Sequence, residues 1–363
     1  MQDAAHGPSG GRGPRKIPQR KILPHRMRPR MSGALAERRP DTVPDDALHG
    51  RVMALREGLE RGLIGSAGLV ERLLIGLLTG GHLLIEGAPG LAKTRAVKRL
   101  ADGLDGSFAR IQCTPDLMPA DLTGTTVWRQ DSGTFEFLPG PLFHALVLVD
   151  EVNRAPPKVQ SALLESMAEG QVTVSGTTHR LSDPFMVVAT QNPIEHAGTF
   201  PLPEAQLDRF LLHVVVDMPD ETTERAILDL VEGEITHHVD AMTMRLSLAD
   251  VRAAREAALS TYVSPALKDY LVRLVAATRT DAAAPDLRAM IEHPASPRGT
   301  LALMMAGKAR AWLRGRDHVI PEDVTDLARD ALSHRIGLTW RAAAEGKTAR
   351  GLVGELVQRV RAL

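Results

Sequence analysis

Short apolar runs and stretches of helical spacing alternate along the chain between residues 46 and 220. Five apolar runs have the length of buried strands, and they cover residues 82–86, 108–112, 145–149, 185–190 and 211–216. Helical spacing of apolar positions lies between some of them, notably over 95–100 and 158–169. Continuous apolar runs of this length, separated by helices, are typical of strands buried on both faces. The pattern therefore predicts an α/β fold in which helices cover both faces of a parallel sheet.

Helices are also predicted before the first strand and after the last one. The apolar positions of the first helix, which begins near Asp46, are Val52, Leu55, Leu59, Leu63 and Ile64. A second, largely buried helix covers 69–78. After about Pro219 the strand pattern stops, and helical periodicity covers residues 223–232, 248–259, 264–278, 298–313, 321–333 and 349–361. We therefore predict an α/β domain at 46–220 and a small all-helical domain at 221–363.

Composition narrows the class of protein without naming it. The 363 residues contain 44 Lys and Arg and 44 Asp and Glu, so the formal net charge is zero. That balance and an aromatic fraction of 3% argue against a dedicated nucleic-acid binder. The single cysteine, Cys113, excludes an internal disulfide. No apolar stretch is long enough to span a membrane, because 68–85 contains Glu71 and Arg72, so we expect a cytoplasmic protein.

The N-terminal residues differ from the rest of the chain. Residues 1–30 hold eight Lys or Arg against one acid, Asp3, with many Gly and Pro. Such a segment is typical of a nucleic-acid arm or an organelle transit peptide, or else of a solvated, disordered tail. It could equally be translated upstream sequence, with the start at Met27 or Met31. We assign 1–45 to a basic, disordered tail and base no function on it.

A glycine-rich stretch after the first predicted strand carries the strongest chemical signal. Strand, glycine-rich turn, Lys-Thr and helix follow one another in the order of a phosphate-binding loop. Backbone N–H groups at the helix start would cradle phosphate oxygens of ATP, Lys93 would reach the β- and γ-phosphates, and Thr94 would bind Mg²⁺. Ala92 stands where glycine is usual, which requires a negative φ at that residue. The predicted loop consists of Gly87, Ala88, Pro89, Gly90, Leu91, Ala92, Lys93 and Thr94.

Two acids follow the apolar run at 145–149, and a strand ending in two acids is the expected partner of such a loop. Asp150 would hold Mg²⁺ through water, and Glu151 would deprotonate the water that attacks the γ-phosphate. A strand that simply ends in a polar turn is the alternative. The loop upstream favours the chemical interpretation.

Three further polar residues are candidates for the same reaction. Asn192, after the run at 185–190, could bond the attacking water or the γ-phosphate, or could be a turn residue before proline. Arg209 could act as an arginine finger on a neighbouring subunit's ATP, or could pair with Asp208 or Glu204. Arg298 could reach the γ-phosphate of its own subunit, or could be an exposed residue at a helix start.

Taken together, these segments resemble the MoxR family of AAA+ ATPases from about Asp46 to the C-terminus. The matching stretches are 87–94, 112–117, 135–143, 150–154, 189–193, 202–210 and 296–298. Alanine before the lysine is usual in that family, whereas Cys113 stands where the family commonly has Phe. The resemblance implies a P-loop sheet with a helical lid domain. It also implies that Asn192 is the first sensor, Arg209 the arginine finger and Arg298 the second sensor.

The resemblance further implies an assembly and a partner. It suggests a homo-oligomer, a hexameric ring, with chaperone-like activity that remodels a protein substrate, such as one with a von Willebrand factor A domain. Arg154 would face the subunit interface, and hairpins at 125–137 and 171–180 would line or rim the pore. Two alternatives stay open at this point: a DNA-directed AAA+ motor, and the ATPase subunit of a metal chelatase.

Overall fold

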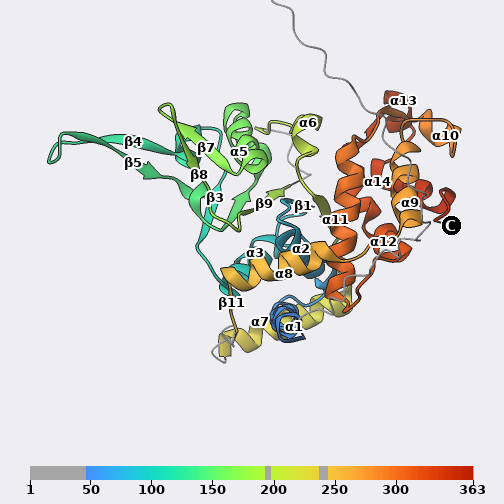
Figure 1. Cartoon of the computed structure of the whole chain (residues 1–363), viewed down its shortest axis with the longest axis horizontal. Helices are drawn as coiled ribbons and strands as arrows, with labels where there is room; N and C mark the ends of the chain where they lie inside the picture. Colours follow the sequence, from blue (N-terminus) through green and yellow to red (C-terminus); the bar gives the residue numbers. More distant parts are fainter. Residues whose placement is uncertain (1–45, 193–197, 237–243, 363) are drawn as a thin grey trace, which may run out of the picture. The chain divides into compact units, whose positions relative to one another are not determined.

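The five predicted strands form one parallel sheet in the computed structural model, which describes residues 46–192, 198–236 and 244–362 (Figure 1). Every neighbouring pair in this sheet is parallel. Its order is β10 (Leu212–Val216), β1 (Leu83–Gly87), β9 (Met186–Gln191), β6 (Leu146–Asp150) and β3 (Phe108–Gln112). The strands are confirmed, with boundaries shifted by at most one residue. The predicted tail, 1–45, and the proline after Asn192 lie outside the described residues.

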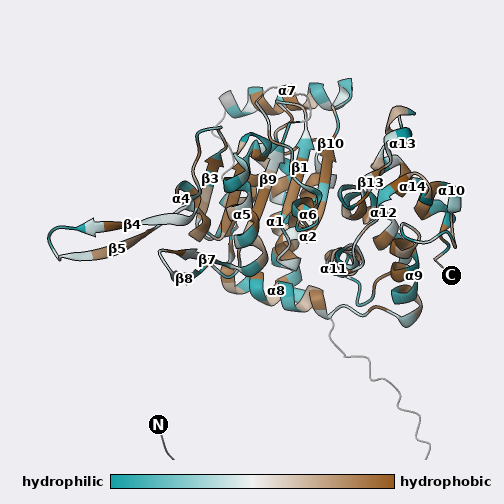
Figure 2. Cartoon of the chain, turned by 90° about the horizontal axis from the view of Figure 1, so that it is seen from above, coloured by the Kyte–Doolittle hydropathy of each residue, from teal (hydrophilic) through white to brown (hydrophobic). Residues whose placement is uncertain are grey.

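Alternate residues of β1, β9 and β6 enter two separate hydrophobic cores, and this explains why these runs are continuously apolar. Leu83 and Ile85 belong to one core, and Leu84 between them belongs to the other. Side chains of consecutive strand residues point to opposite faces, so a sheet covered on both sides needs apolar residues at every position. Figure 2 shows this as brown ribbon along the central strands.

Helices supply the other half of each core. Residues of α1, α2, α3 and α8 line the core that contains Leu83, and residues of α4 and α5 line the one that contains Leu84. The helices before residue 220 are α1 (Asp46–Arg61), α2 (Ala67–Thr79), α3 (Lys93–Asp102), α4 (Pro119–Thr123), α5 (Pro157–Glu169) and α6 (Glu204–Leu207). Those after it are α7 (Glu221–Thr236), α8 (Leu248–Ser260), α9 (Pro265–Ala276), α10 (Pro285–Arg288), α11 (Pro297–Leu313), α12 (Pro321–Leu332), α13 (Trp340–Ala344) and α14 (Ala349–Arg359).

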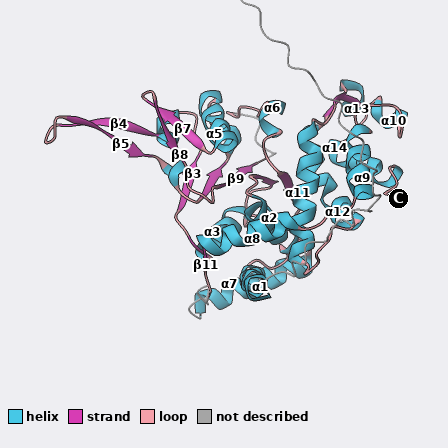
Figure 3. Ribbon diagram, in the orientation of Figure 1, coloured by secondary structure: helices cyan, strands magenta, loops and turns pink. Residues whose placement is uncertain are grey.

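The expectation that strands stop after Pro219 is wrong in detail. The region is predominantly helical (Figure 3), but β11 (Leu246–Ser247) pairs with β2 (Leu104–Asp105), and β12 (Ile291–His293) pairs with β13 (Gly337–Leu338). Strands of two or three residues are too short to show an alternating pattern. Through β11 and α8 the chain returns to the first domain, since α8 packs against α2. All described residues fall in one compact unit, so the boundary at 220 stays a prediction.

Both predicted hairpins are present. The strands β4 (Gly124–Arg129) and β5 (Thr134–Pro139) pair antiparallel, as do β7 (Gln171–Val174) and β8 (Thr177–Arg180). Gly124 permits the first hairpin: its φ is 87° and its ψ 178°, and a Cβ there would lie 2.2 Å from the carbonyl oxygen of Leu138. This backbone conformation is essentially restricted to glycine. Within the described residues, no helix combines the length and the apolar character that a membrane span requires.

Candidate nucleotide-binding site

The carboxyl ends of three adjacent strands bring the predicted site residues together. Strand β9 lies between β1 and β6, so the loop after β1, Asp150 at the end of β6 and Asn192 after β9 share one edge of the sheet. Helix α3 begins at Lys93, directly after the glycine-rich loop. In α/β sheets, ligands bind at this edge. Asn192 is buried there, and its backbone oxygen accepts a hydrogen bond from Asn153 at 3.4 Å.

Asp150 is the centre of the polar contacts at this edge. The residue is 7% exposed, and Oδ1 accepts a hydrogen bond from the hydroxyl of Thr190 at 2.5 Å. Its other oxygen, Oδ2, accepts from the Thr94 hydroxyl at 3.1 Å and from Nη2 of Arg110 at 2.7 Å. A buried carboxylate must be paired or hydrogen-bonded to stay charged. These three partners meet that need without a ligand.

The oxygens of Thr94 and Asp150 fit the ligands of a magnesium ion. Mg²⁺ prefers hydroxyl, carboxylate and water oxygens as ligands. The hydroxyl of Thr94 and Oδ2 of Asp150 lie 3.1 Å apart in a hydrogen bond, so one ion bound by Thr94 would lie beside the Asp150 carboxylate. Because Arg110 already donates to Oδ2, a contact between Asp150 and the metal through water fits this arrangement better than direct ligation.

Glu151 follows Asp150 in a left-handed backbone conformation, with φ 58°. Its N–H donates to the hydroxyl of Thr190 at 3.0 Å, which fixes the turn. Its carboxylate accepts from Nε2 of Gln112 at 3.0 Å and pairs with Nε of Arg154 at 3.5 Å. The turn thus directs Asp150 inward and leaves the Glu151 side chain partly exposed beside it.

Lys93 folds back onto the loop that precedes it. Its ammonium donates to the carbonyl oxygens of Gly87 and Ala88, and of Gln191 at 3.4 Å. Burial lowers the pKa of Lys93, and the carboxylates of Asp150 and Glu151 oppose that shift. Phosphate oxygens would replace the three carbonyls as acceptors.

The expected negative φ at Ala92 is a wrong prediction. Ala92 has φ 53° and ψ 18°, in the left-handed region, and it is the N-cap of α3. The loop must turn sharply to place consecutive N–H groups around one anion, and alternating right- and left-handed residues produce such a concave arrangement. The turn thus determines the φ of Ala92, although an L-residue is strained there.

A cavity of about 730 Å³ adjoins the loop. Gly90, Leu91 and Ala92 line one side of it, and its apolar wall consists of Leu63, Ile64, Leu69, Met218, Pro219, Ile227, Leu230 and Val231. A cavity of this size, with mostly apolar walls beside a phosphate loop, can hold a base and its sugar.

The last helix, α14, also reaches this cavity. Arg350 lines it together with Asp330, and the two are paired at 2.7 Å. Nη1 of Arg350 is buried and has no hydrogen-bond partner within the described residues. Leaving a buried donor without an acceptor costs free energy, so we expect Arg350 to be the lid arginine that donates to a bound nucleotide.

Arg209 and Arg298 lie at the opposite edge of the sheet. Both line a cavity of about 270 Å³ with His82, which precedes β1, and Leu211, which precedes β10. Arg298 pairs with Asp208 at 3.7 Å. Arg209 donates to the carbonyl oxygen of Leu164 and forms no ion pair among the described residues, so the predicted alternative of a pair with Asp208 or Glu204 is absent there.

That position corrects the idea that Arg298 reaches its own subunit's γ-phosphate. The five residues of β1 separate the two edges by about 16 Å, which exceeds the reach of an arginine side chain. Sequence reasoning placed Arg298 at the start of a helix, but it could not say which edge of the sheet that helix start would face. The lid arginine near the phosphate loop is Arg350 instead.

Four site residues were missed by sequence reasoning: Arg110, Gln112, Thr190 and Arg350. Two of them interrupt apolar strands, and a polar residue in a buried run is a signal that could have singled out Arg110 and Thr190. Nothing in the spacing of α14 distinguishes Arg350 from an exposed helical arginine.

A parallel sheet of this order, with a phosphate loop after one strand, two acids after another and a helical lid, defines the class of P-loop ATPases that carry a lid. The model of the ATPase family associated with various cellular activities (AAA) matches residues 82–212, and the AAA lid domain matches 283–356. A crystal structure of a protein described as an ATPase candidate from Cytophaga hutchinsonii superposes with a TM-score of 0.80. It is 40% identical in sequence, and the match covers 87% of this chain and 96% of that one.

Two relatives narrow the class further. Chaperone MoxR1 of Mycobacterium tuberculosis is 43% identical over 304 residues, which cover 83% of this chain and 80% of that protein. Protein MoxR of Methylorubrum extorquens is 31% identical, over 77% of this chain and 85% of its own length. The chain belongs to the MoxR family of AAA+ ATPases.

Proposed function

We propose that this MoxR-type ATPase hydrolyses ATP to ADP and phosphate at the interfaces of a ring, and uses the energy to remodel a partner protein. The observation that carries the hydrolysis is the meeting of Thr94, Asp150 and Glu151 at one edge of the sheet, where Asp150 is buried and bonded to Thr94. Phosphoryl transfer depends on such positioning of a phosphate loop, a metal ligand and a base.

Each residue has a distinct role in this proposal. The N–H groups of 87–94 bind the phosphates, and Lys93 leaves its backbone acceptors for the β- and γ-phosphates. Thr94 and Asp150 hold Mg²⁺, which neutralises charge on the phosphate oxygens when bound. Glu151 removes the proton of the attacking water, and Asn192 orients that water or senses the γ-phosphate.

The place of Arg209 and Arg298 supports the ring in this proposal. Both lie about a strand's length from their own phosphate loop, so they can serve a γ-phosphate only in a neighbouring subunit. AAA+ resemblance supports six subunits, with Arg154 at the interface between them. The assembly would complete each site with an arginine from the next protomer.

The partner is a protein in this proposal. One relative is named a chaperone, which supports an action on other proteins. The β4–β5 hairpin exposes Trp128 and Phe135, whose rings pack edge to face with their centroids 5.0 Å apart. Exposed aromatic side chains of this kind are suited to contact a polypeptide. A substrate with a von Willebrand factor A domain and a cytoplasmic location remain part of the proposal. A DNA-directed motor and a chelatase subunit are not favoured, because the relatives above are MoxR proteins.

The test is ATP hydrolysis against protein concentration, for the parent, Glu151→Gln and Arg209→Ala. We expect the parent's specific activity to rise with concentration, and Glu151→Gln to bind ATP but to lose at least about 100-fold in rate, the scale of a general base. Both variants should be inactive alone. Mixing them should restore activity, because an intact Arg209 then faces an intact Glu151.

Normal turnover in Glu151→Gln would refute its role as the base. Activity that does not depend on concentration and survives Arg209→Ala would refute hydrolysis between subunits. The matched control for charge loss is Arg341→Ala, since Arg341 is exposed on α13 and lines neither the cavity beside the phosphate loop nor the cavity with Arg209.

A further inference from the structure

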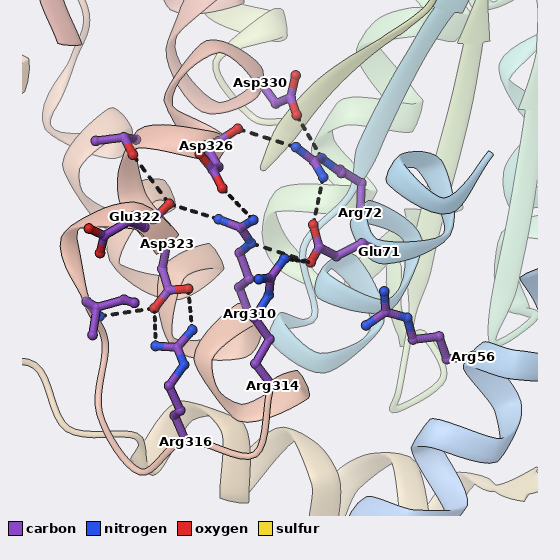
Figure 4. Close-up of polar contacts among 12 residues, drawn as sticks. Arg56, Glu71, Arg72, Arg310, Arg314, Arg316, Glu322, Asp323, Asp326 and Asp330 are labelled. Carbon is purple, nitrogen blue, oxygen red and sulfur yellow. Dashed lines mark hydrogen bonds and ion pairs between the residues drawn. The ribbon is translucent and has the colours of Figure 1, made fainter. Parts of the chain in front are cut away.

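A second large cavity, of about 650 Å³, is lined by none of the phosphate-loop residues. It lies between α1 and α2 on one side and α11, α12 and α14 on the other (Figure 4). Its charged lining residues are five arginines and two acids: Arg56, Arg72, Arg310, Arg314, Arg329, Glu71 and Asp326. Two further carboxylates outside the lining, Glu60 and Asp330, pair with Arg56 and Arg72, so arginines still outnumber their carboxylate partners in one concave site.

Glu71 is the buried centre of this cluster and serves three guanidinium groups. Its side chain is 6% exposed. Oε2 accepts from Nη1 of Arg72 at 2.7 Å, whereas Oε1 is shared between Nε of Arg310 at 3.4 Å and Nη2 of Arg314 at 3.3 Å. Figure 4 shows the three guanidinium groups directed at this one carboxylate. Arg310 also donates to the carbonyl oxygen of Glu322 and to Asp326, whereas the bond of Arg314 to Glu71 is long.

Much hydrogen-bonding capacity around the cavity therefore remains unused. Arg56 pairs through Nε with Glu60 at 2.7 Å, and Arg314 has the single long bond to Glu71. Arg329 has no side-chain hydrogen bond or ion pair with a described residue. Its guanidinium occupies the space left by Gly354, where a Cβ would lie 2.6 Å from Nη2. Arg314 and Arg329 are exposed, so their free N–H groups are accessible to an anion that enters the cavity from solvent.

We infer that this cavity is a second anion site, which binds a small molecule through an oligophosphate group. The planar guanidinium presents paired donors that match phosphate oxygens, and several of them from different helices can surround one multivalent anion. The first residues of α2, Ala67 and Gly68, add backbone N–H groups, since the N-cap Ser66 makes no side-chain cap. Among the described residues that line the cavity none is aromatic, so the phosphates rather than a base would supply the affinity.

This site is distinct from the proposed ATP site, yet Gly68 and Arg72 line both cavities. Arg72 lines both cavities and donates through Nε to Asp330 at 2.9 Å. Asp330 also accepts from Arg350 beside the phosphate loop. An anion that attracts Arg72 thus acts on the pair that borders the nucleotide cavity, although its binding does not depend on whether the chain hydrolyses ATP.

The experiment is calorimetric titration with inorganic tripolyphosphate in two backgrounds that block the phosphate loop. One is the Lys93→Ala chain, and the other is the parent saturated with ADP, which keeps the proposal testable if the substitution impairs folding. We expect one tripolyphosphate to bind in each background. Arg314→Ala with Arg329→Ala should weaken that binding at least about tenfold, since each lost charged contact is a strong one.

Two controls distinguish specific binding of tripolyphosphate in this cavity from a general attraction of the anion to positive charge. Arg129→Ala with Arg341→Ala removes two exposed arginines elsewhere and should change the affinity less than about twofold. Asp326→Asn removes an acid from the lining and should tighten binding. No binding in either background, or equal losses in the two double variants, would overturn the inference.

Discussion

At the residue scale, Ala92 shows how the phosphate loop stores backbone strain. With φ 53° at the N-cap of α3, its side chain costs about 1–2 kcal/mol that glycine would not. Glycine would remove this strain, but part of the gain in stability would be offset, because glycine loses more conformational freedom on folding. The strain is confined to the residue directly before Lys93, where the loop must curve around a phosphate.

Ala92→Gly should therefore raise the free energy of unfolding, by up to about 1 kcal/mol. Urea denaturation of the two chains measures the difference. The matched control is Ala96→Gly in the same helix, where the backbone is right-handed and buried, and it should lose at least about 1 kcal/mol. A loss of stability in Ala92→Gly comparable to the control would contradict the strain at this position.

His82 is a second residue whose environment has a measurable consequence. Its Nε2–H donates to the carbonyl oxygen of Met167 at 3.1 Å, and Nδ1 accepts from the N–H of Val187 at 3.0 Å. Both ring nitrogens are thus used by the neutral form. Burial lowers the pKa of His82 from 6.5 to about 4, against the opposing hydrogen bond to Met167.

The free energy of unfolding should fall as the pH falls from 6.5 to about 4. In that window the unfolded state binds a proton that the folded state excludes, which is a loss of about 3 kcal/mol in all. His82→Asn should be less stable at pH 7 but should lose less between pH 6.5 and pH 4. Urea denaturation at both pH values tests this, and an unchanged pH slope in the variant would exclude His82 as its source.

At the scale of elements, helix α14 decides which lid arginine faces the nucleotide. It begins at Ala349, and its second residue is Arg350, which lines the same cavity as the phosphate loop; its Nη2 donates to Asp330 of α12, while Nη1 has no partner among the described residues. Helix α11 instead carries Arg298 to the far edge of the sheet. Helices α11 and α14 of the lid therefore place their arginines near opposite edges of the sheet.

Arg350→Ala should weaken ADP binding about tenfold, because a charge-assisted hydrogen bond to the nucleotide contributes about 1.5–3 kcal/mol. Arg350→Lys should recover part of the loss, since it restores the charge but not the planar donor pair. Arg298→Ala serves as the comparison. Isolated subunits of this variant should bind ADP with the affinity of the parent. Equal weakening of ADP binding by Arg298→Ala would instead indicate that Arg298 is the lid residue that contacts the nucleotide.

At the scale of the whole molecule, the carboxylate of Glu71 joins α2 to the helices of the lid. It accepts from Arg310 and Arg314, and Arg310 continues to Asp326 of α12 at 2.6 Å. Arg310 is 5% exposed, so its charge depends on these acceptors. One hydrophobic core contains residues from β1 to α14. The ion pairs of Glu71 and Arg310 therefore add a polar contact between helices that already share this core.

Glu71→Gln should lower the free energy of unfolding by roughly 1–3 kcal/mol, since it leaves buried arginine donors with a weaker acceptor. It should also speed hydrogen exchange in α2 and α11, as measured by mass spectrometry. Glu60→Gln is the control, because Glu60 forms an i,i+4 pair on α1 and its loss should cost less than about 0.5 kcal/mol. If both substitutions cost the same, the network does not hold the lid.

Much of the sheet and of the phosphate side of the site could be predicted from the sequence, because those signals are local. A buried strand shows as a run of apolar residues, and a phosphate loop and a strand-end acid pair each occupy a few consecutive positions. Gly87, Lys93, Asp150 and Asn192 come together since they follow neighbouring parallel strands, and the chain order of α/β units predicts that edge.

What only the tertiary structure decided concerns residues that meet across large separations in sequence. Arg110 and Thr190 reach Asp150 through strand pairing, and the φ of Ala92 is imposed by the closed turn. The sequence by itself determined the five strands of the sheet, the long helices and the class of ATPase, since periodicity and motif are properties of contiguous residues. The edge of the sheet that Arg298 faces depends on how the lid packs on α2 and the sheet, and packing depends on shape and charge at every contact.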